Sequence, residues 1–135
     1  LKHFGKMLEP HISSFAAQFQ AEADLDVRKL SMTECWVNMM GNGTTHDFHT
    51  HDSAVISGTY YVQSPCGCSG LCFEDPRTDL MTAMGRRKLI EFPVRSGEVI
   101  LFPGWLRHTV PPNGGGAEER IGLSFNYAVR SKPSS

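Results

Sequence analysis

Apolar residues near the N-terminus recur at the spacing of an α-helix. They follow one another at intervals of three and four residues: Ile12, Phe15, Ala16 and Phe19. Pro10 stands just before this run, and proline is favoured in the first turn of a helix. The pattern predicts one amphipathic helix over residues 9–23 that opens near Pro10.

After residue 30 the pattern changes to short β-strands. β-branched and aromatic residues, interrupted by Gly, Pro and Asn, predict seven or eight strands, at residues 30–40, 47–52, 54–63, 71–74, 88–94, 98–102, 107–110 and 120–129. The segment 47–52 is polar and is either a short strand or the edge of one. Many short, evenly spaced strands are typical of a sandwich or a barrel-like double sheet.

Length and composition limit the chain to one domain of an ordinary water-soluble kind. It has 135 residues, a net charge of -1 and no apolar run close to the roughly 20 residues of a membrane span. We expect a helical segment at 1–29 that packs on the sheet, a β core at 30–129 and a disordered tail at 130–135. We expect no nucleic-acid or membrane partner. The first residue is Leu1 rather than Met, which leaves open a preceding segment.

The four cysteines predict neither a zinc site nor a disulfide framework. Cys66, Cys68 and Cys72 form C-x-C-x3-C in a Gly/Ser-rich stretch, without the paired CxxC spacing of a structural zinc site. We expect reduced thiols on a turn, which favours a cytoplasmic protein.

Three histidines predict a metal site. His49 and His51 are separated by one residue, and alternate residues of a strand project to the same face. His108 follows a strand and a Pro-Gly turn that can bring it back to this pair. Imidazole binds iron, zinc, copper and nickel, and three ligands on one face leave coordination positions open.

The last predicted strand carries a second feature, an arginine beside small and polar residues. Alternation places four of its residues on one face: Arg120, Gly122, Ser124 and Asn126. A guanidinium group on an inward face suits a carboxylate, which it binds through two hydrogen bonds. The alternative is a surface arginine paired with Glu118 or Glu119.

The order of these motifs resembles a known superfamily. His49-x-His51, then His108, then Arg120 is similar to the His-x-Asp…His…Arg motif of the 2-oxoglutarate/Fe(II)-dependent oxygenases. Blocks between Cys35 and Asn126 resemble a small, mostly uncharacterised family of such oxygenases from bacteria and their phages.

The resemblance implies a mainly β protein, a double-stranded β-helix of the jelly-roll or cupin-like kind with an N-terminal helix. It implies Fe(II) bound by His49, His51 and His108, which would be the catalytic centre. It also implies 2-oxoglutarate as co-substrate, with Arg120 on its distal carboxylate. Additional contacts would come from Tyr60 or Tyr61 and from Asn38 or Ser124. The expected reaction is hydroxylation of an unidentified small molecule or side chain.

Two positions depart from the superfamily pattern. His51 stands where a carboxylate is usual, so the iron site has one negative charge fewer. Gly122 stands where a serine usually follows the arginine by two positions.

Two alternative functions use the same residues. Gly43-x5-His49-x-His51 and Gly97-x5-Pro103-x4-His108 resemble incomplete cupin motifs, which would fit a three-histidine iron dioxygenase that does not use 2-oxoglutarate. The second alternative is a metal-binding β-helix without catalysis. Under any of the three, short exposed strands make a homodimer plausible. Asp75 and Arg77 form either an ion pair that orients a loop over the site or an ordinary turn.

Overall fold

The computed structural model describes residues 2–18, 27–43, 46–49, 53–77, 85–114, 116 and 118–129, with residues 27 and 46–49 described by their backbone alone. The elements are, in chain order, α1 (Lys2–Ala17), the short 3₁₀-helix η1 (Val27–Lys29), β1 (Leu30–Met40), β2 (His46–His49), β3 (Ile56–Gln63), β4 (Leu71–Glu74), β5 (Leu89–Phe92), β6 (Val99–Pro103), β7 (His108–Val110) and β8 (Arg120–Val129).

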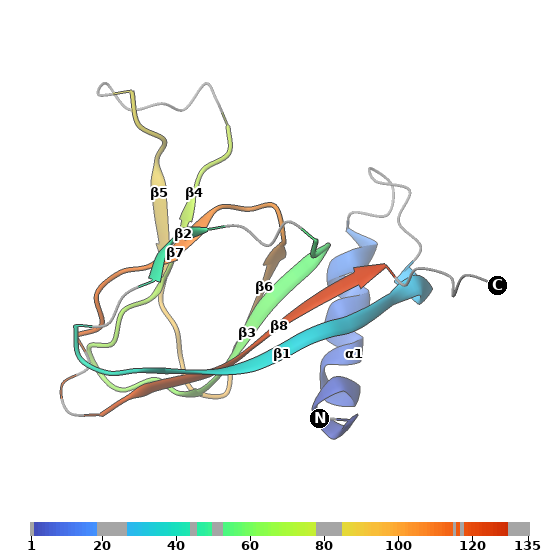
Figure 1. Ribbon diagram of the computed structural model, residues 1–135, viewed down its shortest axis with the longest axis horizontal. Coiled ribbons are helices and arrows are strands. Elements are labelled where there is room, and N and C mark those ends of the chain that lie inside the picture. The colour runs from blue at the N-terminus through green and yellow to red at the C-terminus, as the bar shows by residue number, and fades with distance from the viewer. Residues whose placement is uncertain are drawn as a thin grey trace.

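The strands form two four-stranded antiparallel sheets. The larger sheet has the order β1-β8-β3-β6 and the smaller one β2-β7-β4-β5. The chain therefore changes sheet after every strand except β4, which is followed by its neighbour β5 in the same sheet. Figure 1 shows α1 lying across the larger sheet, on the side away from the β4-β5 pair. The prediction of a mainly β fold with an N-terminal helix is confirmed.

The predicted strands correspond closely to the observed ones. β1, β4 and β8 have the predicted bounds, and the described part of β2 ends at His49, because Thr50 to Asp52 lie outside the described residues. The predicted start of the helix is wrong: α1 begins at Lys2, so Pro10 lies inside it rather than in its first turn. The predicted helix extends to residue 23, whereas α1 ends at Ala17 and Gln18 lies in a turn. Residues 19–23 and the predicted tail 130–135 lie outside the described residues.

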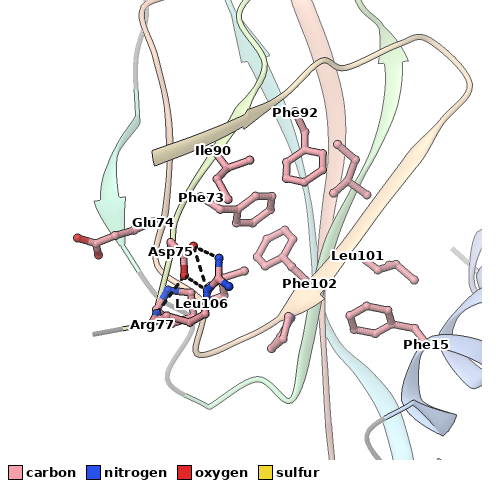
Figure 2. A pocket seen from close by; sticks show the side chains of 13 residues that line it. Phe15, Phe73, Glu74, Asp75, Arg77, Ile90, Phe92, Leu101, Phe102 and Leu106 are labelled. Atoms are coloured by element: carbon pink, nitrogen blue, oxygen red, sulfur yellow. Dashed lines mark hydrogen bonds and ion pairs between the residues drawn. The ribbon is translucent and has the colours of Figure 1, made fainter. Parts of the chain in front are cut away.

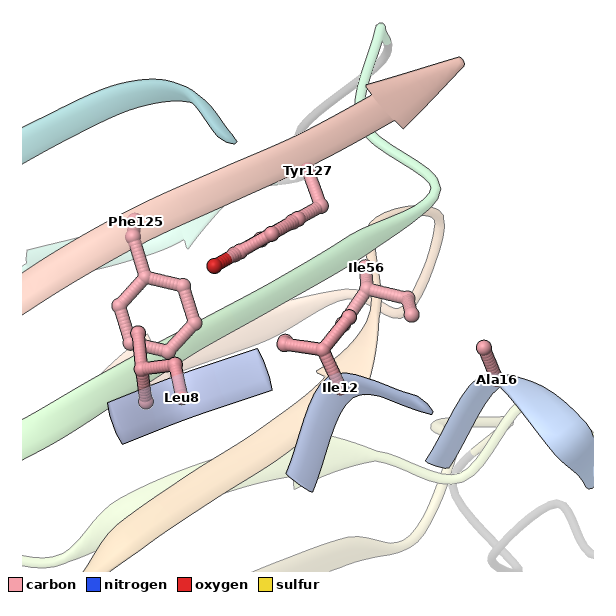
Figure 3. Packing of buried hydrophobic residues seen from close by; sticks show 6 residues of the cluster. All are labelled: Leu8, Ile12, Ala16, Ile56, Phe125 and Tyr127. Carbon is pink, nitrogen blue, oxygen red and sulfur yellow. The ribbon is translucent and has the colours of Figure 1, made fainter. Parts of the chain in front are cut away.

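Helix α1 packs on the outer face of the larger sheet. Its buried residues lie at intervals of four (Leu8, Ile12 and Ala16), and they contact Ile56 of β3 and two aromatic residues of β8. Figure 3 shows this cluster, with Phe125 and Tyr127 of β8 directed at the helix. Burial of each large apolar side chain contributes roughly 1.5–3 kcal/mol, so Leu8 and Ile12 together offset the cost of a proline inside the helix.

The inner face of the larger sheet carries the opposite set of residues. β8 lies between β1 and β3, and Ser124 is paired with Trp36 on one side and Thr59 on the other. Gly122 is paired with Asn38 and Tyr61. Because side chains alternate along each strand, these polar residues share the face opposite to the helix.

In the part of the chain that the structure describes, no helix is both long and apolar enough to cross a membrane.

Candidate functional site: a polar pocket between the sheets

A pocket of about 200 Å³ lies between the two sheets. The larger sheet and the smaller sheet both contribute to its lining: Trp36, Asn38, Gly58, Thr59, Tyr61, Leu71, Phe102, His108, Val110, Arg120, Gly122, Ser124 and Phe125. Five residues that the sequence singled out thus line one pocket, namely Arg120, His108, Tyr61, Asn38 and Ser124.

Arg120 is a buried cation without a counter-ion among the described residues. Its side chain is 5% exposed, and no carboxylate in the described part of the chain lies within ion-pair distance of it. One terminal nitrogen lies 3.1 Å from the sulfur of Met40, and Nε has no hydrogen-bond partner among the described residues. A buried charge is strongly destabilising unless it is paired, so this arrangement favours an anion bound at Arg120. The alternative of a surface arginine paired with Glu118 or Glu119 is wrong.

Tyr61 places a second hydrogen-bond donor beside Arg120. The guanidinium carbon lies 5.0 Å from the centre of the Tyr61 ring, and the Tyr61 hydroxyl is buried without a partner among the described residues. Burial raises the pKa of Tyr61 to about 12, although the positive charge of Arg120 acts in the opposite direction. The hydroxyl therefore keeps its proton at neutral pH and can donate a hydrogen bond to an anion.

Tyr60, the other tyrosine considered for this role, lies elsewhere. It is paired with Leu123 on the helix face of the sheet, and its ring centre is 6.0 Å from that of Phe4 in α1. The structure therefore brings Tyr61, and not Tyr60, into the pocket with Arg120.

A chain of side-chain hydrogen bonds lines the wall of the pocket. Trp36 Nε1 donates to Asn38 Oδ1 at 3.1 Å, and Asn38 Nδ2 donates to Ser124 Oγ at 2.6 Å. The hydroxyls of Ser124 and Thr59 lie 2.9 Å apart. Sequence reasoning named Asn38 and Ser124 but missed Trp36 and Thr59. Their positions opposite Ser124 depend on the strand order, which local patterns do not give.

His108 of β7 also lines the pocket and is 4% exposed. Its Nδ1 lies 3.0 Å from the carbonyl oxygen of Leu106, which can only accept a hydrogen bond. Nδ1 therefore carries the proton in the neutral ring, and Nε2 carries the lone pair that a metal needs. A backbone carbonyl that fixes the tautomer in this way is common behind metal-binding histidines.

The predicted partners of His108 are placed only in part. His49 of β2 is directly opposite His108 of β7 in the strand register, while His51 lies outside the described residues. Among described side chains, no group of three or more His, Cys, Asp or Glu residues gathers to hold a metal. The three-histidine site therefore stays a prediction, supported at two positions by the backbone register.

The space beside Gly122 explains one departure from the superfamily pattern. A Cβ atom at Gly122 would lie 2.8 Å from the Thr59 side-chain methyl carbon. The Thr59 methyl group thus occupies the volume that a side chain at position 122 would need. The Thr59 hydroxyl, in turn, supplies a polar group to the wall at this level.

Two acidic residues at the end of β4 and directly after it pair with arginines. Asp75 accepts hydrogen bonds from the Arg77 side chain, the shortest of them 2.8 Å, and these bonds lower the pKa of Asp75 to about 2. Glu74 lies 3.6 Å from Arg107. Both alternatives for Asp75 and Arg77 are seen together: the two side chains form an ion pair, and Asp75 Oδ1 also accepts a hydrogen bond from the backbone N–H of Arg77 at 3.0 Å, as in an ordinary turn. The cysteines are free thiols, as expected.

Comparisons with known proteins agree with this geometry. The sequence profile of the family described as "Putative 2OG-Fe(II) oxygenase" matches residues 34–126. No curated protein sequence matches the chain.

Among solved structures, the chain is similar to a 2OG-Fe(II) oxygenase family oxidoreductase from Burkholderia pseudomallei, with 17% identity and a TM-score of 0.58 over 86% of this chain and 57% of that one. It is also similar to a prolyl-4-hydroxylase from Pseudomonas putida, with 20% identity and a TM-score of 0.56 over 88% and 62%. HygX from Streptomyces hygroscopicus, solved with iron bound, gives 16% identity and a TM-score of 0.56 over 89% and 68%.

At these identities the solved structures establish the fold alone, and the chain spans only 57% and 62% of the first two. The family match is more informative because it covers well over half of the chain and includes His49, His51, His108 and Arg120. On that match, this chain belongs to the 2OG-Fe(II) oxygenase family.

Proposed function

We propose that this protein is an Fe(II)- and 2-oxoglutarate-dependent dioxygenase that hydroxylates a C–H bond of a substrate. In the overall reaction, dioxygen, 2-oxoglutarate and the substrate R–H give R–OH, succinate and carbon dioxide. One oxygen atom enters the substrate and the other enters succinate. Family membership supports the reaction class, and the polar pocket supports the co-substrate.

The buried Arg120, which has no counter-ion among the described residues, carries the proposal. Arg120 Nε and the Tyr61 hydroxyl are two buried donors without an acceptor among the described residues, and they line the same small pocket. A carboxylate satisfies both at once, since it accepts up to four hydrogen bonds. The pocket also contains His108, so a dicarboxylate bound at Arg120 extends toward the proposed iron ligand.

His49, His51 and His108 would hold the iron. The His108 tautomer, fixed by the Leu106 carbonyl, fits this role. Bound Fe(II) would supply the activation of dioxygen that C–H hydroxylation requires. Three neutral imidazoles, instead of two and a carboxylate, leave the site with one negative charge fewer.

The protein's own contribution is to bind and orient 2-oxoglutarate. Arg120 and Tyr61 would hold the distal carboxylate at the closed end of the pocket. The hydrogen-bonded side chains of Asn38, Ser124 and Thr59 fix one wall. Leu71, Phe102 and Val110 form apolar walls that exclude water and strengthen the interaction between the carboxylate and the guanidinium.

The test is anaerobic addition of Fe(II) and then 2-oxoglutarate to the protein, followed by visible absorption spectroscopy. We expect the charge-transfer band of a keto acid chelated to iron. We expect the band to disappear in His108→Ala and to need much more 2-oxoglutarate in Arg120→Met. Arg95→Met, which removes an arginine with a 71% exposed side chain, is the matched control and should behave as the unchanged protein.

Each other result has a definite meaning. Iron binding without the band would contradict the use of 2-oxoglutarate and favour a cupin-type three-histidine dioxygenase, in which Arg120 holds the carboxylate of the substrate itself. Failure to bind iron would overturn the assignment of His49, His51 and His108.

A further inference from the structure

A second and larger cavity lies at the edge of the sandwich where β5 and β6 leave the sheets open. Its volume is about 450 Å³, within the usual range of small-molecule sites. Its apolar lining includes Phe15, Phe73, Ile90, Phe92, Leu101, Phe102 and Leu106. Figure 2 shows Phe73, Ile90, Phe92 and Phe102 gathered between the strands, with Leu101 and Phe15 on the side of α1.

An aromatic wall joins this cavity to the proposed iron site. Phe102 lines both the apolar cavity and the polar pocket. The ring centre of Phe102 is 4.7 Å from that of His108, and the ring centre of Phe73 is 6.2 Å from it. Leu106, whose carbonyl fixes the His108 tautomer, lines the cavity as well. A ligand in the cavity would therefore lie one side chain away from a predicted iron ligand.

The cavity opens along β5, and its lining there is only partly covered. Ile90 is 37% exposed and Phe92 is 47% exposed, although both lie on the strand face that carries the packed ring of Phe73. Contact with an apolar ligand would remove this surface from water, at roughly 25 cal/mol for each Å² buried. The opening thus favours an apolar occupant over water.

The charged residues at the rim pair with one another. Asp75 binds Arg77 and Glu74 lies beside Arg107, so the rim presents two ion pairs rather than a single unpaired charge. This differs from the polar pocket, where Arg120 has no counter-ion among the described residues. Paired charges of opposite sign give little net attraction for a charged ligand, so the rim is compatible with an uncharged one.

We propose that this cavity binds the substrate and that the substrate is an uncharged, apolar small molecule or a molecule with such a group. The substrate class rests on the proposed function, whereas binding of an apolar molecule in the cavity does not. Phe73 and Phe102 would pack against the substrate and direct its reacting end toward His108.

Binding is tested with the protein free of iron and 2-oxoglutarate, using Nile red, an uncharged fluorophore that brightens in apolar surroundings. We expect saturable binding that falls at least tenfold in Ile90→Asp. The matched control is Leu89→Asp on the same strand. Leu89 is 50% exposed and does not line the cavity, so this variant should bind Nile red as the unchanged protein does. Both positions are already exposed, and circular dichroism should show that both variants fold.

No saturable binding, or equal affinity in both variants, would overturn the proposed cavity. Where Nile red binds as expected, nuclear magnetic resonance of the His108 ring in the same iron-free protein tests its nearness to the active site. A shift on Nile red addition is the expected result, and an unchanged His108 signal would overturn the link between the cavity and the site.

The substrate role is tested by succinate formation from 2-oxoglutarate with a panel of uncharged aromatic and aliphatic compounds. We expect stimulation that is lost in Ile90→Asp and kept in Leu89→Asp. If the charge-transfer band forms but no compound in the panel stimulates succinate formation, the substrate class is wrong and the proposed function stands. If the band itself is absent while Nile red binds, the proposed function is wrong and the apolar site stands.

Discussion

The two cavities share Phe102 as a wall and differ in almost every other property. The polar pocket lies mainly on β8 and β3, the two central strands of the larger sheet, with Trp36 and Asn38 added from β1 beside β8. The apolar cavity lies between the edge strands β5 and β6 and the start of the loop after β4. The first presents fixed donors to an anion, and the second presents a partly exposed aromatic surface.

The difference suggests that the two cavities of the sandwich have separate roles, one for the co-substrate and one for the substrate. Recognition of a co-substrate common to a whole family needs donors held in one arrangement, and the centre of a sheet provides this. Recognition of a particular substrate needs a surface that can change without disturbing the fold, and edge strands provide that. The following variants test whether the two cavities are as independent as this suggests.

The largest effect should come from Phe102, because it belongs to both cavities. Phe102 is 4% exposed, and Phe102→Ala should reduce the free energy of unfolding by about 3–5 kcal/mol. Urea unfolding measures the change. Phe92→Ala, at a position that is 47% exposed, is the control and should lose clearly less. Equal losses would show that Phe102 is not a supporting wall.

Arg120→Met should impair anion binding in the polar pocket without affecting the apolar cavity. Loss of two charge-assisted hydrogen bonds, each worth about 1.5–3 kcal/mol, should weaken 2-oxoglutarate binding roughly 150-fold or more, as measured by titration calorimetry. Without 2-oxoglutarate, the melting temperature should stay the same or rise, since the variant removes a buried charge that has no counter-ion in the part of the chain that the structure describes. Nile red affinity should not change. A large drop in melting temperature would instead indicate that Arg120 has a structural role.

Gly122→Ala should disturb the pocket wall by crowding. The added Cβ would lie 2.8 Å from the Thr59 methyl carbon, and such overpacking typically destabilises by about 1–3 kcal/mol. Thr59→Ser removes this methyl and keeps the hydroxyl that meets Ser124. The double variant should therefore recover most of the loss in a double-mutant cycle of urea unfolding. Simple additivity would contradict the contact.

Tyr61→Phe should have the smallest effect on binding. A hydrogen bond contributes about 1 kcal/mol, so the loss of this one should weaken 2-oxoglutarate binding about fivefold. The folded-state pKa of about 12 is above the usual value of 10.0, so the unfolded chain ionises first as pH rises. The contribution of Tyr61 to the free energy of unfolding is therefore present in full below about pH 10 and is lost as the pH rises toward about 12. Tyr61→Phe should show less of this alkaline loss in urea unfolding, and Tyr60→Phe is the control.

Much of this fold could be predicted from the sequence because its strands alternate regularly and its turns are rich in Gly and Pro. The face of β8 that carries Arg120, Gly122 and Ser124 followed from alternation alone, and the register confirms it. The choice between Tyr60 and Tyr61 could not be made in this way. It depends on which face of β3 packs on α1, and that is decided by residues far apart in the chain.

The wrong helix start and the failure to predict the apolar cavity also arise because packing between distant residues decides both features. Pro10 suggested a helix start because proline is usually excluded from helix interiors, but the stripe of Leu8, Ile12 and Ala16 buries enough apolar surface to keep the helix continuous through it. The apolar cavity had no local signal. Ile90 and Phe92 have the pattern of an ordinary core strand, and only the sheet order shows that β5 lies at an open edge.

The position of β8 also has a consequence for how the protein acquires its site. β8 is the last strand of the described fold, yet it lies between β1 and β3, and Leu30 is paired with Val129 across almost the whole chain. Strand pairings this distant in sequence form slowly, because a long loop must close before any contact is gained. Arg120 and Ser124 enter only with this strand, so the anion site should appear at the final, slowest stage of folding. A chain interrupted before β8 would have all three histidines and still lack the means to bind the co-substrate.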